Sequence, residues 1–442
     1  MKEKPLLSFL IKSAQAVVLY FAILFLVPSN NPLSSLIGYS LVGIIPVLFF
    51  AKLLIDDNSS IKFLAFAYII KILIGVFHYI WFIDPTYFHG SGDEVKLTSV
   101  NDFMSMFDQV GVFVDNFDGS MKSIGEYGNM PHAELYALMS LTFKIVGNYY
   151  LTIIPLNVVC SLFIALMITY VVKLRGGNYQ VALFLCSFFP MTLLSDYFFR
   201  DAFGLMICTF ALVLVLLSKE WYKILILVFA SYLFYWQRTM YVVIPFIAYF
   251  LHQIINSSNR KQDPGKIIFY IIIFAFALMF ASTFIGGVYE DNRGYTSTTQ
   301  SLISYLTFPI RYFLCIIGPF PWTQCFNGKV ENTFMMGDFF FSAALFYLTI
   351  KGYPLLVKDY RRGVGIDYLV IVGFLIMIMG IMNPAHHLGY VGWGLLFFVP
   401  TLTRIFQWSS FVRFHIVFFA LMILFNILYI MMGLGGIMNA IS

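Results

Sequence analysis

Two neighbouring carboxylates, Asp93 and Glu94, end the segment His89-Gly90-Ser91-Gly92-Asp93-Glu94, which follows a long apolar run by a few residues. Adjacent carboxylates on a glycine-flanked turn can accept a proton from a hydroxyl group or hold a divalent cation. The alternative is a pair of solvated loop acids with no chemical role. We take Asp93 and Glu94 as candidate catalytic bases. No cofactor is expected, although a divalent cation is an open alternative at this pair.

Three arginines interrupt apolar sequence. Arg200 and Arg238 fall in short turns between apolar runs, and Arg311 lies inside the apolar stretch 300–318. A planar guanidinium group can bind a phosphate through two hydrogen bonds at once. The alternative for Arg200 is that it only neutralises a neighbouring aspartate. The residue type and its placement indicate a set of arginines that binds a substrate phosphate.

Further candidates for substrate binding lie beside these segments. One aspartate directly follows the first of the three arginines, a tryptophan follows a proline-rich turn, and a histidine opens a short amphipathic stretch. Another histidine stands in a polar turn, one helical turn before a tyrosine. Aromatic rings can stack on a sugar, whereas the histidines lack the additional ligands that a metal site needs, so no metal is predicted. These candidates are His132, Asp201, Trp322, His386 and Tyr390.

Membrane-spanning helices must position these residues. The chain has 442 residues, of which 60% are hydrophobic and 11% charged, and this balance excludes a soluble globular protein. We predict an all-α polytopic membrane protein, a single integral domain over 1–442, with about 13 transmembrane helices of about 20 residues each. The predicted spans are 8–27, 34–54, 61–82, 150–172, 178–195, 198–218, 221–236, 238–255, 266–285, 334–351, 365–382, 387–404 and 411–431.

The distribution of Lys and Arg indicates which ends of the spans share a side. If the stretches 132–147 and 300–318 do not cross the membrane, most of the 27 Lys and Arg residues fall on the side of the N-terminus, as the positive-inside rule requires. We therefore expect a plasma or inner membrane protein with a cytoplasmic N-terminus and an active site on the outer face. Two long extracytoplasmic loops, 83–149 and 286–333, each contain a surface or re-entrant helix.

Several functions are not expected from this sequence. It contains no phosphate-binding P-loop, no dinucleotide-binding glycine motif and no HExxH motif. The net charge of +5 follows from lysines and arginines near the predicted inner surface, so no nucleic-acid partner is expected. One lysine, Lys71, falls inside the span 61–82, where it must face the bundle interior or a water-filled cavity.

The pattern resembles the GT-C class of membrane glycosyltransferases over residues 83–255. The resemblance depends on many spans, an acidic pair opening a long outer loop, and a short helix in that loop. In that class the acidic loop usually follows the first helix, whereas here it follows the third. The residues that carry the resemblance are Asp93-Glu94, Pro131-His132, Gly147, Asn157, Lys173-Leu174-Arg175-Gly176-Gly177 and Pro190.

This resemblance implies a glycosyltransferase of cell-surface polysaccharide or glycoconjugate assembly. Its partners would be a polyprenyl-phosphate-linked sugar donor, a glycan or lipid-linked acceptor, and the membrane lipids. Asp93 or Glu94 would remove the proton of the acceptor hydroxyl, and Arg200 and Arg238 would stabilise the charge on the leaving phosphate.

Three alternatives stay open. The outer arginines are also similar to those of O-antigen and exopolysaccharide polymerases, which transfer whole lipid-linked repeat units. A lipid-glycan flippase or other transporter would be expected to show internal repeats and ionisable residues near the bilayer midplane. An intramembrane acyltransferase would use His78 or His386.

Overall fold

The computed structural model describes residues 5–78, 108–125, 132–188, 201–257, 312, 343–382 and 394–431. Within these ranges the chain forms helices and turns and contains no strand. The all-α class predicted from the sequence is therefore confirmed for the described part of the chain.

Within the described residues, four helical segments are long and apolar enough to cross a membrane. They are α1 (Pro5–Leu24), α2 (Pro32–Leu54), α3 (Asn58–His78), and α8 (Ile153–Leu174) with the short helix η2 (Tyr150–Thr152) before it. Each reaches the length of about 20 residues that a bilayer requires. Their length and composition support an integral membrane protein, and the count of about 13 spans stays a prediction.

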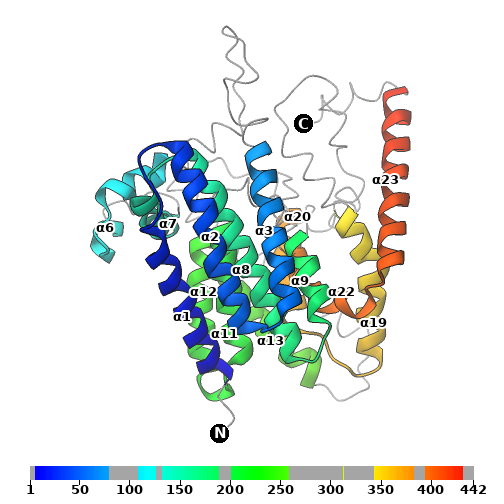
Figure 1. The fold of residues 1–442 in the computed structure, drawn as a ribbon. Helices are drawn as coiled ribbons and strands as arrows, with labels where there is room; N and C mark the ends of the chain where they lie inside the picture. Colours follow the sequence, from blue (N-terminus) through cyan, green and yellow to red (C-terminus); the bar gives the residue numbers. More distant parts are fainter. Residues whose placement is uncertain are drawn as a thin grey trace.

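The other helices of the described part are drawn in Figure 1, and all of them except α23 are shorter than α1. They are α6 (Met121–Gly125), α7 (Ala133–Val146), α9 (Tyr179–Phe188), α11 (Asp201–Leu217), α12 (Glu220–Gln237), η3 (Thr239–Val243), α13 (Ile244–Ser257), η5 (Leu348–Gly352), α19 (Tyr353–Arg361), α20 (Tyr368–Met382), α22 (Val399–Ile405) and α23 (Trp408–Met431).

Two predicted spans differ from the structure because of prolines. The span expected over 334–351 does not end there: its helix passes through the π-helical turn η5 into α19. A π turn relieves the clash that Pro354, at the start of α19, would cause in a regular helix. The span expected over 387–404 is interrupted by a turn at 397–398, and Pro400 then opens the short helix α22.

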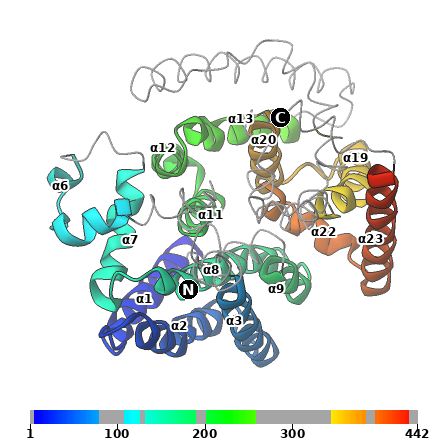
Figure 2. The ribbon, with the colours of Figure 1, turned by 90° about the horizontal axis from the view of Figure 1, so that it is seen from above.

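The core of the bundle is built around α8. Every residue from Ile153 to Val172 is buried, as expected for a helix that is apolar on all sides. Figure 2 shows α11 inside the bundle, with α1 and α8 on one side and α12 and α13 on the other, whereas α23 stands at the edge. Lys71 of α3 is fully buried, which confirms that it faces the interior.

One aromatic contact and two polar contacts define one end of the bundle, which we call the N-terminal end because α1 begins there. Phe9 of α1 stacks on Tyr170 near the end of α8, with ring centroids 5.7 Å apart. At the same end, Lys173 donates to the carbonyl of Ile55, and Arg175 pairs with Asp367. These contacts bring segments near residues 55, 173 and 367 together at this end.

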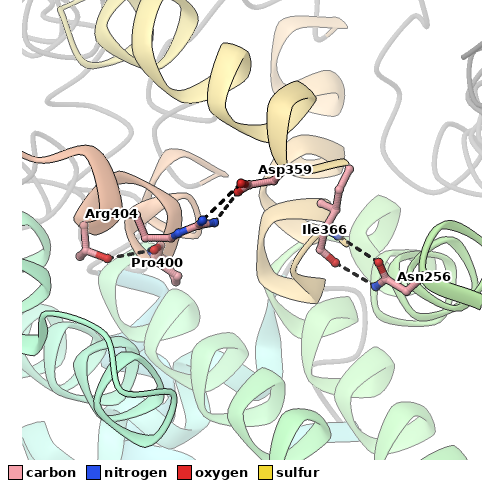
Figure 3. A network of polar contacts seen from close by, with 6 residues as sticks. Asn256, Asp359, Ile366, Pro400 and Arg404 are labelled. Atoms are coloured by element: carbon pink, nitrogen blue, oxygen red, sulfur yellow. Dashed lines mark hydrogen bonds and ion pairs between the residues drawn. The ribbon is translucent and has the colours of Figure 1, made fainter. Parts of the chain in front are cut away.

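Two further contacts tie the C-terminal helices together at this end (Figure 3). Arg404 of α22 pairs with Asp359 of α19 through both of its terminal nitrogens. Asn256 of α13 accepts from the backbone N–H of Ile366 at 3.0 Å and donates to its carbonyl at 3.1 Å. The helix α13 ends here, so it begins at the opposite end of the bundle, where α12 ends. We call this opposite end the site end.

The short helix α7 belongs to the first predicted outer loop. Its 14 residues span about 21 Å, which is less than the hydrocarbon thickness of about 30 Å. The helix is therefore too short to cross a bilayer, in agreement with the prediction that the stretch 132–147 does not cross. Tyr136, Ala137 and Met139 are fully buried, and α7 contacts α1, α11 and α12. The helix is therefore packed into the bundle rather than lying only on its surface.

Candidate functional site

Three of the residues predicted to carry chemistry lie in the described part of the chain: His132, Asp201 and Arg238. His132 and Asp201 are 69 residues apart along the chain, yet both contact the last turn of α12. His132 contacts the carbonyl oxygen of Trp236, Asp201 contacts the side-chain amide of Gln237, and Arg238 directly follows that turn. The other predicted residues lie outside the described residues, and these are Asp93, Glu94, Arg200, Arg311, Trp322, His386 and Tyr390.

His132 stands directly before α7 in an unusual backbone conformation. Its φ of 62° and ψ of 30° lie in the left-handed region, which L residues other than Asn, Asp and His rarely adopt. The imidazole does not cap its own helix, and Nδ1 instead lies 3.0 Å from the carbonyl oxygen of Trp236. Because a carbonyl oxygen only accepts, Nδ1 carries the hydrogen, and the basic lone pair of the neutral ring is on Nε2.

The ring of His132 is held from a second side. It meets the ring of Tyr136, one turn further along α7, edge to face with centroids 6.3 Å apart. A left-handed backbone, a bonded Nδ1 and an aromatic neighbour together restrict the imidazole to one orientation. Such an ordered histidine can accept a proton or bind a hydroxyl group.

Asp201 is the first residue of α11. A carboxylate is favourable there because the first turn of a helix carries partial positive charge. The residue is 7% exposed, so its charge is largely removed from water. The amide Nε2 of Gln237 donates to its Oδ1 at 2.9 Å. A buried carboxylate that is held by a hydrogen bond is an unusual feature in a membrane protein, where ionisable groups mark functional sites.

Arg238 ends α12. Its backbone is extended, with φ of −157° and ψ of 130°, and its N–H donates to the carbonyl of Phe234 at 3.0 Å. The chain then enters η3, and the N–H of Tyr241 donates to the carbonyl of Arg238 at 2.8 Å. The guanidinium group is thus attached at the point where α12 stops, beside the contacts of His132 and Asp201.

Two side chains and one chain position thus lie at the same end of the bundle: the imidazole of His132 at the carbonyl of Trp236, the carboxylate of Asp201 at the amide of Gln237, and the backbone of Arg238 directly after them. These groups can bind hydroxyls and a phosphate, and they can transfer a proton. Among the residues that the structure describes, no three His, Cys, Asp or Glu side chains come close enough to hold a metal ion. Asp93 and Glu94, for which a divalent cation is an alternative, lie outside the described residues.

Sequence reasoning missed two members of this site, Trp236 and Gln237. Gln237 is 1% exposed, and Trp236 packs edge to face on Tyr232 with centroids 5.2 Å apart. The one available signal was a glutamine at the end of an apolar run, next to Arg238. Its partner is 36 residues away, so no local pattern could identify the pair.

No match to this chain was found among protein-family models, curated proteins or solved structures.

Proposed function

We propose that this chain transfers a sugar from a polyprenyl-phosphate-linked donor to an acceptor hydroxyl at the site end of the bundle. The observation that supports the proposal most is that His132 and Asp201 both contact the last turn of α12, which Arg238 directly follows. The donor requires a cation that binds its phosphate, and the sugar and acceptor require polar groups that bind their hydroxyls.

The reaction has one displacement step. The acceptor oxygen attacks the anomeric carbon of the donor sugar, and the bond from that carbon to the phosphate oxygen breaks, leaving its electron pair on the polyprenyl phosphate. Arg238 stabilises the negative charge that develops on this phosphate. A base takes the proton of the acceptor hydroxyl. Asp93 or Glu94 is that base in the proposal, and His132 and Asp201 bind the sugar and acceptor hydroxyls.

The position of the site suits a lipid-linked substrate. The helices α1, α2, α3 and α12 present large apolar side chains outward, among them Val18, Leu41, Leu73 and Leu225, each more than 60% exposed. In a membrane such faces contact lipid tails. A polyprenyl chain can therefore stay in the bilayer while its phosphate and sugar reach the end of α12.

The test is mass spectrometry of lipid-linked and surface glycans from source cells that lack the gene and carry the wild-type chain or Asp201→Asn. We expect the deletion to accumulate lipid-linked intermediates that lack a sugar. Asp201→Asn should reduce transfer by about 10- to 100-fold, which corresponds to the loss of a charged hydrogen bond of about 1.5–3 kcal/mol.

Asp359→Asn is the matched control, because it changes another buried carboxylate, 4% exposed, at the N-terminal end. It should leave transfer per folded molecule unchanged. Complete repeat units accumulating outside would instead identify a polymerase, and complete units retained inside would identify a flippase. A glycan profile that is the same with and without the gene would contradict any role in glycan assembly.

A further inference from the structure

Gly204 lies three residues after Asp201 on α11, so the two residues share a face of that helix. The same face continues to Cys208, whose Sγ lies 4.0 Å from the carbonyl oxygen of Leu233 on α12. Small residues on such a face commonly let two membrane helices approach closely. Close packing of α11 and α12 is therefore the first explanation to test for a glycine at this position.

The surroundings of Gly204 do not fit that explanation. A Cβ atom built on Gly204 would overlap Oε1 of Gln237 and lie 2.6 Å from its Cδ, and its three nearest atoms all belong to that side chain. By contrast, a Cβ on Gly373 of α20 would lie 2.5 Å from the backbone oxygen of Gly394. Gly373 thus makes room for a backbone, whereas Gly204 makes room for an amide.

The orientation of that amide follows from its partner. A carboxylate only accepts hydrogen bonds, so the atom of Gln237 that faces Asp201 must be Nε2, and Oε1 must face Gly204. Within the described part of the chain Oε1 has no hydrogen-bond partner, although Gln237 is 1% exposed. A leucine or methionine would fill the same space without burying an unsatisfied acceptor, so packing alone does not account for a glutamine here.

We propose that Gln237 is a positioning residue, which orients the carboxylate of Asp201 toward the substrate. Gly204 lacks a side chain and so leaves the space that the amide of Gln237 occupies. The inference rests on the proposed function, because it assumes that Asp201 binds a substrate hydroxyl. A neutral amide is suited to this task because its N–H fixes the carboxylate without cancelling its charge. Gly204, Gln237 and Asp201 then act as one unit.

The experiment compares five variants in cells that lack the gene and accumulate the lipid-linked intermediate. They are Asp201→Asn, Gln237→Ala, Gly204→Ala, Gly204→Ala with Gln237→Ala, and Gly204→Ala with Gln237→Asn. The rate of transfer is measured by mass spectrometry and divided by the amount of folded protein, which is measured by gel filtration and thermal unfolding in detergent. Gly373→Ala is the control for adding a methyl group to a glycine in a helix.

We expect Gln237→Ala and Gly204→Ala each to lower the rate at least about tenfold, because a displacement of about 1 Å in a binding group is enough for such a loss. The double alanine variant should be no slower than Gln237→Ala alone, since the amide is already absent. In the Gly204→Ala background, Gln237→Asn should raise the rate, because the amide is shorter by one methylene group and avoids the added methyl. Gly373→Ala should lower the amount of folded protein instead.

Additive losses in the double alanine variant, or a wild-type rate in Gly204→Ala while Asp201→Asn is slow, would overturn the inference and leave the proposed function standing. No rescue by Gln237→Asn would also overturn it, because a residue that only fills space has no need of an amide. A wild-type rate in Asp201→Asn is a different result: it removes the proposed role of Asp201 and the inference with it.

Discussion

At the N-terminal end of the bundle, Asp359 and Asp367 each meet an arginine, whereas at the site end Asp201 is held by the neutral amide of Gln237. An ion pair neutralises both of its partners, and it serves to fasten two segments together. An amide donor satisfies one lone pair of a carboxylate and leaves the negative charge in place. The two ends therefore differ in how a buried carboxylate is held: by an arginine at Asp359, and by an amide donor at Asp201.

Each end contains a residue other than glycine in the left-handed region. Asp56, at the N-terminal end, has a φ of 51°, and His132, at the site end, has a φ of 62°. Such a conformation is unfavourable for a side chain and persists where surrounding contacts determine it. Asp56 pairs with Lys52, whereas His132 contacts the carbonyl oxygen of Trp236.

The largest difference between the ends should appear when their arginines are exchanged for alanine. Arg238→Ala should lower the rate of transfer by about 10²–10³-fold, the range for loss of a group that stabilises developing charge. Thermal unfolding should change little. Arg404→Ala leaves Asp359 buried without its arginine, so it should lower the free energy of unfolding by about 1–3 kcal/mol and leave transfer per folded molecule unchanged. Equal effects of both variants on transfer would break the comparison.

An intermediate effect is expected from Asn256→Ala. This variant removes both hydrogen bonds to the backbone of Ile366 and leaves that backbone without a partner for them. The free energy of unfolding, measured by chemical denaturation in detergent, should fall by about 1–3 kcal/mol. Asn116→Ala is the control, because within the described residues the exposed side chain of Asn116 donates to the carbonyl of Val112, four residues earlier in the same segment. If both variants unfolded alike, the N-terminal end would not depend on this contact.

A smaller effect separates the backbone of His132 from its ring. Glycine adopts the left-handed region without strain, whereas alanine does not, so His132→Gly should be more stable than His132→Ala by about 1 kcal/mol. Both variants should lose transfer to the same extent, because both lack the imidazole. The measurements are thermal unfolding and the glycan profile. Equal stability of the two variants would show that this conformation is not retained without the ring.

The smallest effect is a pH dependence at the N-terminal end. Asp57 caps α3: its Oδ2 accepts from Oγ of Ser60 at 2.7 Å and from its N–H at 3.0 Å. The Ser60 hydroxyl is the main cause that holds the pKa of this carboxyl below its usual value, followed by the Ser60 N–H. A group whose folded pKa is lowered stabilises the fold above its unfolded pKa of about 3.9, and this contribution is lost as the pH falls through the folded pKa.

Asp57→Ala should therefore unfold at a lower temperature than wild type at neutral pH, and the difference should shrink as the pH falls below about 4. Thermal unfolding in detergent over that range measures it. A difference that stays constant with pH would mean that the cap does not depend on the carboxylate.

The sequence identified three members of the candidate site because their types are unusual in their places. Arg238 and Asp201 are charged residues at the ends of apolar runs, and His132 opens an amphipathic stretch. Such placement is visible in one dimension. The alternation of apolar runs also predicted the long spans, since length and composition alone determine whether a helix can cross a bilayer.

The contacts within the site could not be predicted in the same way. Gln237 and Gly204 are uncharged and lie in apolar helices, where each resembles a packing residue. Their roles depend on which faces of α11 and α12 meet, and that is set by packing across the whole bundle rather than by local pattern.

In the proposed reaction, the bond between a sugar and a polyprenyl phosphate breaks at the site end. The most direct test places the purified chain in lipid nanodiscs with the lipid-linked intermediate isolated from deletion cells and with its glycan acceptor, and measures the released polyprenyl phosphate by mass spectrometry. The account predicts release with the wild-type chain, with Arg238→Ala slower by about 10²–10³-fold and Arg404→Ala unchanged per folded molecule. Equal release by wild type and Arg238→Ala, or no release by the wild-type chain, would contradict it.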